Sequence, residues 1–219
     1  AAPVSGVESL LDYDATLISS GGGVFSRSAK TITVSSEARK ALGIAGERES
    51  FTPAELIGAI LRAPVDLVWN GGIGTYIKAR TQTNAEVGDK ANDAIRINGS
   101  DLRCRVVGEG GNLGSTQLGR IEASRAGVRI NTDAIDNSAG VDTSDHEVNI
   151  KILLQPLVAS RVLDADSRVS LLQSMTDEVA AHVLADNYAQ NVMLGVGRAS
   201  KPILLRKIAV FAVRHVQTA

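Results

Sequence analysis

Three clusters of glycine, asparagine, aspartate and serine mark the places where this sequence is able to hold a small polar ligand. They are residues 70–75, 109–116 and 136–145, and each comes after a short apolar run. Glycine lets a ligand approach the backbone closely, and an asparagine amide both donates and accepts hydrogen bonds. Because few cations lie among these residues, the clusters suit a planar, largely neutral group such as a carboxamide with its ribose.

Asn112 and Asn137 are the side chains that best match a carboxamide, which also donates and accepts hydrogen bonds. Asparagine equally stabilises tight turns, and in that case neither residue contacts a ligand. The residues alone leave both interpretations open.

His146 lies between Asp145 and Glu147, with Asp142 nearby. Metal ligation is one interpretation, but the spacing matches no standard helical ligand motif and the group contains a single histidine. Acid–base catalysis is a second, because histidine titrates near neutral pH. We favour a third, a solvated helix start whose acidic residues are stabilised by the helix dipole, and we predict no metal site.

Several catalytic motifs are missing from the sequence. There is no G-x-S-x-G nucleophile turn, no phosphate-binding loop with Gly-Lys-Ser/Thr, and no complete G-x-G-x-x-G. If the fold binds a dinucleotide, we expect its phosphate-binding turn to lie upstream of this chain. Residues 21–23, three glycines followed by Arg27 and Lys30, form either an anion-contacting loop or, as we favour, a surface loop.

Short apolar strands must carry the ligand-holding clusters. We expect strands at residues 65–69, 106–107 and 128–131, alternating with helical patterns. This alternation favours an α/β fold, here a partial doubly wound, Rossmann-like parallel sheet followed by a helical C-terminal segment. The carboxyl ends of parallel strands share one edge of a sheet, so we expect the clusters to gather there.

Capping residues predict where the first helices begin. Ser35 or Ser36 is expected to cap a helix that Gly43 ends. Thr52 is expected to cap the next helix, with Pro53 at its first position and a glutamate three residues after the cap completing a capping box.

Two later helices are predicted from weaker capping signals. Asn84 is expected to cap a helix over residues 85–95, and Asp166 or Ser167 to cap a long one over residues 169–195.

Three parts are expected along the chain: a helical and loop lead-in at residues 1–63, a Rossmann-like part at residues 64–155, and a helical segment at residues 156–219. The chain starts without methionine and ends in an apolar helical pattern, so we expect a piece excised from a larger protein. The apolar residues of that last pattern are Ile208, Val210, Phe211 and Val213.

Bulk composition excludes several classes of partner. The formal net charge is -1 and aromatic residues make up 3% of the 219, so we expect no nucleic-acid partner. No run approaches the roughly 20 apolar residues of a membrane span, so we expect no membrane partner. The chain has one cysteine, Cys104, and no visible signal peptide. We therefore predict a buried thiol and a cytoplasmic location.

Long segments of the chain resemble the large bacterial NAD-specific glutamate dehydrogenases. The resemblance is dense over residues 11–155 and rests on specific motifs. These are SSGGGVFSRSAKTI, VDLVWNGGIGTYIKA, ANDAIR, VVGEGGNLGSTQLGRIE and INTDAIDNSAGVDTSDHEVNIKILL. It implies oxidative deamination of L-glutamate to 2-oxoglutarate and ammonia, with NAD as cofactor, in a cytoplasmic enzyme of amino-acid catabolism. A homo-oligomer is implied for the full-length protein.

The resemblance also implies roles for particular residues. Asn137 would contact the nicotinamide end of NAD, and Ser144 the side-chain carboxylate of the substrate. The loop beside the nicotinamide ribose would be Gly71 to Thr75. The predicted cofactor contacts outside Asn137 are Gly71, Gly72, Gly74, Thr75, Glu109, Gly110, Gly111 and Asn112.

Departures from the family pattern limit what this chain is expected to do alone. Ser138 and Ala139 stand where the wider family has alanine and glycine, and Asp142 and Asp145 are unusual near a dianionic substrate. The family's catalytic lysine and aspartate lie in a substrate domain that this sequence does not contain. We predict no catalytic residue here and no dehydrogenase activity without the remainder of the full-length chain.

Two other functions stay open at this stage. The same half-sheet would serve a non-catalytic regulatory module that binds a nucleotide or an amino acid. Residues 156–219 would also serve as an oligomerisation segment.

Overall fold

The computed structural model describes residues 14–200, which divide between Asp133 and Ala134 into two compact units. The expected boundary after residue 155 falls inside one continuous helix, α6 (Ser138–Ala159), whereas the units separate before that helix begins. The apolar pattern expected near residues 208–213 lies outside the described residues.

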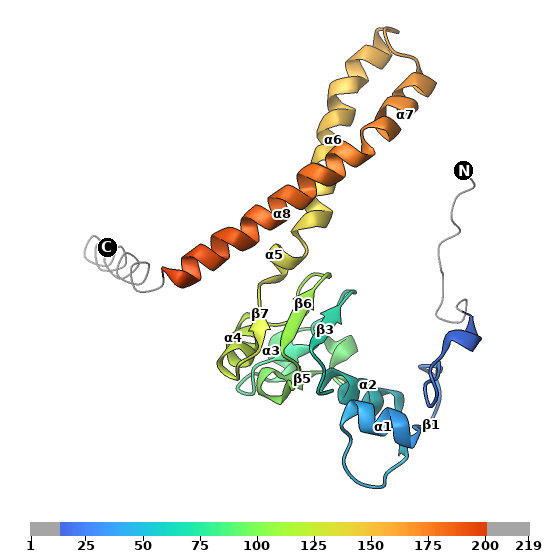
Figure 1. Ribbon diagram of the computed structural model, residues 1–219, viewed down its shortest axis with the longest axis vertical. Helices are drawn as coiled ribbons and strands as arrows, with labels where there is room; N and C mark the ends of the chain where they lie inside the picture. The colour runs from blue at the N-terminus through green and yellow to red at the C-terminus, as the bar shows by residue number, and fades with distance from the viewer. Residues whose placement is uncertain (1–13, 201–219) are drawn as a thin grey trace. The chain divides into compact units, whose positions relative to one another are not determined.

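The first unit is built on a parallel three-stranded sheet (Figure 1). Strands β3 (Leu67–Asn70), β6 (Val106–Glu109) and β7 (Arg129–Ile130) lie in the order β3-β6-β7. Asn70 pairs with Glu109, so the last residues of β3 and β6 lie side by side. The predicted α/β class with a parallel sheet and later helices is therefore confirmed.

Short elements make up the rest of the described chain before α6. Two further strand pairs are present, β1 with β2 antiparallel and β4 with β5 parallel. Apart from β3, β6 and β7, the elements before α6 are, in chain order, η2 (Ala15–Leu17), β1 (Ile32–Thr33), α1 (Ser36–Leu42), β2 (Ser50–Phe51), α2 (Pro53–Leu61), β4 (Ile77–Lys78), α3 (Asn84–Val87), η3 (Lys90–Asn92), β5 (Ile97–Asn98), η4 (Gly99–Asp101), α4 (Gln117–Arg125) and α5 (Asp133–Asp136).

The first two helices begin where their capping residues predict. Ser35 caps α1, and Gly43 ends it in the left-handed conformation at φ 62°. Thr52 caps α2 in a capping box with Glu55, and Pro53 occupies the first turn. Local hydrogen bonds decide both starts, which is why spacing alone was sufficient.

The single helix predicted over residues 85–95 is wrong. Helix α3 covers four residues, is capped by Thr83 rather than Asn84, and ends at Gly88 with φ 77°. The 3-10 turn η3 follows. Gly88 ends the helix because glycine adopts the left-handed conformation without a steric penalty.

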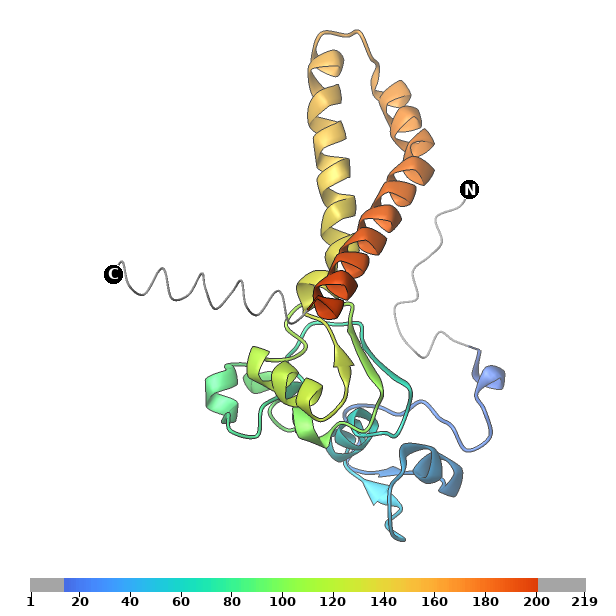
Figure 2. The ribbon, with the colours of Figure 1, turned by 60° about the vertical axis from the view of Figure 1, so that its left-hand side comes forward.

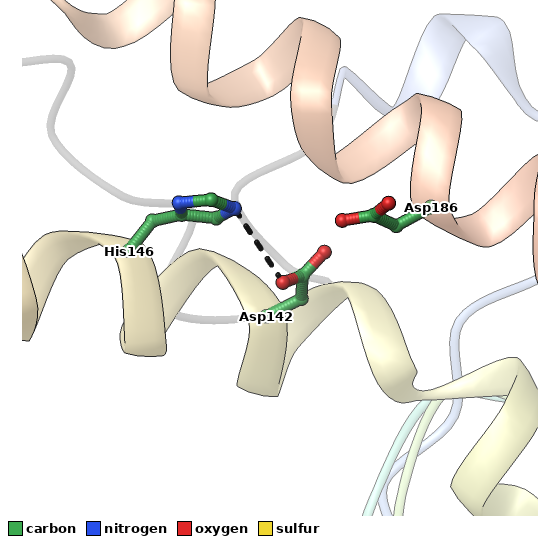
Figure 3. A group of neighbouring side chains, drawn as sticks. All are labelled: Asp142, His146 and Asp186. Atoms are coloured by element: carbon green, nitrogen blue, oxygen red, sulfur yellow. Dashed lines mark ion pairs between the residues drawn. The ribbon is translucent and has the colours of Figure 1, made fainter.

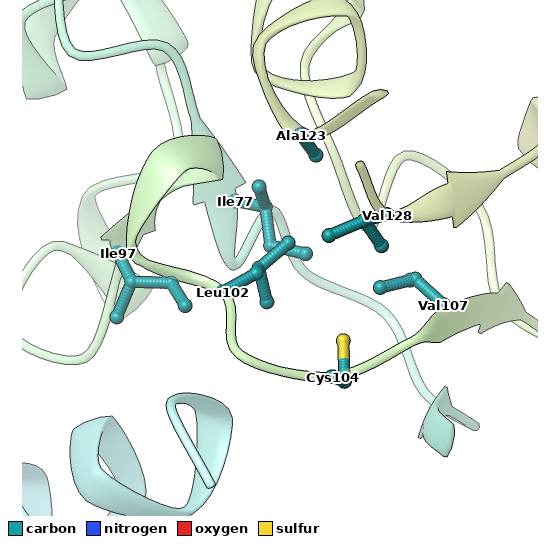
Figure 4. Close-up of a cluster of buried hydrophobic side chains, with 7 residues drawn as sticks. All are labelled: Ile77, Ile97, Leu102, Cys104, Val107, Ala123 and Val128. Atoms are coloured by element: carbon teal, nitrogen blue, oxygen red, sulfur yellow. The ribbon is translucent and has the colours of Figure 1, made fainter. Parts of the chain in front are cut away.

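A hydrophobic core lies against the sheet of the first unit (Figure 4). Val107 of β6 and Ala123 of α4 are 2% and 0% exposed. Cys104 is buried in the same core, as predicted, and burial raises the pKa of its thiol. The cluster consists of Ile77, Ile97, Leu102, Cys104, Val107, Ala123 and Val128.

In the described part of the second unit, three helices follow α5: α6, α7 (Ala165–Ser174) and α8 (Thr176–Ala199). Helix α8 runs back along α6, so the two pack as an antiparallel pair (Figures 1 and 2). The long helix predicted over residues 169–195 is in fact split at Met175, and Asp164 caps α7 in place of Asp166 or Ser167. Among the described helices, none is long and apolar enough to cross a membrane.

Candidate functional site

Two glycine-rich loops meet where β3 and β6 end, and we call residues 70–75 and 109–114 together the strand-end site. The backbone C=O of Asn70 accepts hydrogen bonds from the N–H of Gly110 at 2.8 Å and of Gly111 at 3.1 Å. A Cβ on Gly111 would lie 2.3 Å from the carbonyl oxygen of Gly72. The loops therefore touch backbone to backbone, and only glycine permits that approach.

Thr75 ties the two loops together. Its Oγ1 donates to the carbonyl of Leu113 at 2.8 Å, and its N–H donates to Asp89 Oδ2 at 2.8 Å. Arg96 Nε donates to the carbonyl of Thr75 at 2.7 Å. The N–H of Thr75 and the Asn92 amide hold the pKa of Asp89 below its ordinary value.

Glu109 supports the second loop from inside the protein. Its side chain is 0% exposed, and its Oε1 accepts from Arg120 at 2.8 and 3.2 Å. Removing a single partner from a buried ion pair costs about 3–5 kcal/mol. The carboxylate is thus turned into the protein, where it positions the loop.

Asp133 anchors the other end of the second loop. The N–H of Leu113 donates to Asp133 Oδ2 at 2.9 Å, and Leu113 adopts a positive φ of 56°. Arg120 lies 3.6 Å from the other oxygen of Asp133, so this arginine links both acids.

The outer rim of the strand-end site faces solvent. Gly71, Gly72 and Asn112 are exposed, whereas Gly74 is buried. Ile73 and Leu113 are 88% and 66% exposed, which places two apolar side chains at the rim. The indole of Trp69 packs over Gly108 and Gly110, where a Cβ would come within 2.6 Å of the ring, yet Trp69 itself is 60% exposed.

A small cavity of about 140 Å³ lies beneath the loops. Asn70 Nδ2 and Ser115 Oγ at its wall are buried and have no hydrogen-bond partner among residues 14–200. Ligand pockets usually span about 300–1,000 Å³, so this cavity is large enough for water and too small for a dinucleotide.

Asn137 and Ser144 belong to the second unit. Asn137 is partly buried immediately before α6, and Ser144 is exposed within that helix. The third cluster was expected to form a loop at a strand end. Instead residues 138–145 form the first turns of α6, because no residue there ends the helix.

His146 is not at a helix start, which corrects the interpretation that we favoured. Helix α6 begins at Ser138, two turns earlier, and His146 Nε2 lies 3.6 Å from Asp142. The ring of His182, on α8, stacks on that of His146 with centroids 6.0 Å apart.

Sequence reasoning missed the residues that hold the strand-end site in place. Asp89, Arg96, Arg120 and Asp133 are not among the site residues predicted from the sequence. Each acts across a gap in sequence that no local pattern reports, for example 21 positions from Arg96 to Thr75.

A parallel sheet whose glycine loops meet at its carboxyl edge is typical of α/β domains that bind nucleotide cofactors. The chain belongs to the family described as bacterial NAD-glutamate dehydrogenase, catalytic domain, whose model matches residues 5–197.

Curated relatives agree with this family. The chain is 58% identical over 198 residues to an NAD-specific glutamate dehydrogenase of Mycobacterium tuberculosis, covering 89% of this chain and 12% of the relative. It is 58% identical over 183 residues to one of Halomonas elongata, covering 84% and 11%. A third, from Pseudomonas aeruginosa, is 54% identical over 187 residues, covering 85% and 11%. The chain thus spans about an eighth or less of each relative's length.

Proposed function

We propose that this chain is one segment of a longer NAD-dependent glutamate dehydrogenase, in which it forms the nicotinamide side of the active cleft. The reaction is the oxidative deamination of L-glutamate to 2-oxoglutarate and ammonia, and NAD supplies the hydride acceptor when bound. Family membership and the activity named for the three relatives support this proposal.

The observation that carries the proposal is the backbone contact between Gly111 and Gly72 at the ends of parallel strands. This contact holds the two loops together, so that the exposed glycines Gly71 and Gly72 let a flat ligand approach the backbone, and the Asn112 amide on the same exposed rim matches a carboxamide. These groups fit the nicotinamide and its ribose. The glycine motif of a pyrophosphate-binding turn, G-x-G-x-x-G, is incomplete in this sequence.

Different parts of the strand-end site take different roles in this proposal. The backbone of Gly71 and Gly72 and the side chain of Asn112 face the cofactor, and Gly110 and Gly111, whose N–H groups donate to the carbonyl of Asn70, join the two loops beside it. Gly74, Thr75 and Glu109 hold the loops in shape, since Gly74 and Glu109 are buried and Thr75 bridges the two loops.

Asn137 and Ser144 complete the assignment from the second unit. We assign Asn137 to the nicotinamide end and Ser144, through its hydroxyl donor, to the side-chain carboxylate of glutamate. The substrate domain, a homo-oligomeric state and a cytoplasmic location belong to the same proposal for the full-length protein.

Apolar exposure in the second unit also favours a longer protein. Ile152, Leu153 and Met193 are 64%, 72% and 77% exposed. Contiguous exposed apolar surface often marks a contact with another part of a protein, which is consistent with a longer polypeptide.

Amide chemical shifts of this chain during titration with NAD test the cofactor assignment. We expect the largest changes at residues 71–75 and 109–114, and Asn112→Ala should weaken binding at least tenfold, about 1.4 kcal/mol. Asn191→Ala is the matched control, because this exposed asparagine only donates to the backbone of its own helix. Equal affinity in both variants, or shifts confined to other residues, would contradict the assignment.

A parallel titration with L-glutamate separates the two functional classes. Shifts caused by the amino acid without any response to NAD would favour the regulatory module. In the full-length enzyme, Ser144→Ala should raise KM for glutamate at least tenfold, about 1.4 kcal/mol, with KM for NAD unchanged. A rise in KM for NAD alone would remove Ser144 from the substrate site.

A further inference from the structure

Two antiparallel helices of the second unit carry mirrored pairs of ionisable side chains. On α6, Asp142 and His146 are four residues apart, and on α8, His182 and Asp186 are also four residues apart. Residues at that spacing lie on one helix face. Because the helices run in opposite directions, aspartate meets aspartate and histidine meets histidine.

The side chains of this His–Asp cluster converge in the structure (Figure 3). Ligand atoms of Asp142, His146 and Asp186 all lie within 4.8 Å of one another. Figure 3 shows the two α6 side chains on the side of their helix that faces α8, with the Asp186 carboxylate directed back toward Asp142. His182 completes the group by stacking on His146, with 25° between the rings.

The distances within the cluster suit a shared cation better than a direct hydrogen bond. His146 Nε2 and Asp142 Oδ1 are 3.6 Å apart, beyond the usual hydrogen-bond range. Two ligands of a tetrahedral ion with bonds of about 2.1 Å lie about 3.4 Å apart. The ligand atoms lie at most 4.8 Å apart, so ion binding requires side-chain rotations that shorten the longest separation by about 1.4 Å.

An unsatisfied carboxylate oxygen gives an independent sign of a ligand. Asp142 Oδ2 is buried and accepts no hydrogen bond from any residue in the described part of the chain. A buried carboxylate oxygen without a donor is costly, and a bound cation removes that cost.

We propose that Asp142, His146 and Asp186 bind a divalent first-row transition cation of the Zn²⁺ class, with His182 or water as the fourth ligand. Imidazole nitrogen together with carboxylate oxygen suits such ions, and two carboxylates neutralise the double positive charge. The ion would clamp α6 to α8.

This metal site is separate from the proposed substrate contact. Ser144 is two residues from both Asp142 and His146, so it lies on a different face of α6. The metal site and the substrate contact can therefore be tested independently, because a substitution in one site leaves the other site intact.

Calorimetric titration of the metal-free chain with Zn²⁺, followed by Co²⁺ absorption spectra, tests the site. We expect one equivalent to bind, with a raised Tm, and His146→Gln and Asp186→Asn each to weaken binding at least about tenfold. Asp177→Asn is the control, because Asp177 is an exposed acid of α8 outside the three-ligand group.

Two results would overturn the proposal. One is the absence of binding at Zn²⁺ concentrations up to about 100 µM, because the binding free energy would then be too weak for a built site. The other is unchanged affinity in Asp186→Asn, which would place the ion elsewhere. Asp186 is exposed, so Asp186→Asn should keep its fold. This variant therefore tests the metal site even if His146→Gln unfolds.

Discussion

At the level of single residues, the strand-end site depends on glycines, which have no side chain. Gly72 and Gly111 are both predicted cofactor contacts, yet the space around their Cα atoms differs. A Cβ on Gly111 would meet the carbonyl of Gly72 at 2.3 Å, whereas a Cβ on Gly72 would meet nothing within 4 Å. One glycine is required by packing, and the other is free to serve a ligand.

Gly111→Ala should destabilise the first unit by about 1–3 kcal/mol, because the loops must separate to make room for the methyl group. Gly72→Ala, the matched control, should change stability by less than about 1 kcal/mol. Urea unfolding followed by Trp69 fluorescence measures both, since Trp69 is the one tryptophan and packs beside the second loop. Equal losses in the two variants would show that the loops do not touch as described.

The buried Glu109–Arg120 pair shows a second residue-scale effect. A charged residue in a glycine loop resembles a ligand contact when only the sequence is known. The structure turns its side chain inward, so the same position shapes the loop.

At the level of elements, two helices of this chain begin with the same capping box. Thr52 with Glu55 starts α2, and Thr83 with Glu86 starts α3. Only the first has an arginine partner, Arg48, at 2.6 Å from the glutamate. The pair of boxes therefore offers an internal comparison.

Glu55 should titrate with a pKa of about 2, because Arg48 and then Thr52 hydrogen-bond its ionised carboxylate. Its folded pKa lies below the ordinary 4.5, so the stability it contributes is present above pH 4.5 and is lost as pH falls toward 2. Carboxyl NMR titration measures this directly.

Arg48→Gln provides the control for that titration. It should raise the pKa of Glu55 and leave Glu86 unchanged, because the pKa of Glu86 is lowered by Thr83 alone. A Glu55 pKa that stays near 2 in this variant would show that the capping box, and not the arginine, dominates.

At the level of the whole molecule, we propose that the chain holds a cofactor-facing edge and that the family's catalytic groups lie in other polypeptide. Lys78 donates to Asn98 at 2.7 Å, and Lys151 pairs with Glu147 on the surface of α6. These two lysines therefore have partners outside the strand-end site.

The purified 219-residue chain should therefore show no NADH formation from L-glutamate and NAD, measured by absorbance against a full-length relative as positive control. Turnover that co-purifies with the chain and disappears in Asn112→Ala would contradict this expectation. It would mean that the catalytic groups lie within these residues.

Interactions between near neighbours determined much of this protein from sequence alone. The α/β class, the starts of α1 and α2, the burial of Cys104 and the two glycine loops depend on spacings of a few residues, and all were predicted. The early end of α3 and the split at Met175 were missed, because in each case a single residue interrupts a weak local preference for helix.

Only the tertiary structure decided which distant side chains meet. Asp89 and Arg96 reach Thr75 through the packing of β4 and β5, and Asp186 reaches Asp142 through the return of α8 along α6. These contacts join residues 14 to 44 positions apart, so no local period reports them. Their geometry depends on how helices and strands pack, which is a property of the folded chain and its buried apolar surface.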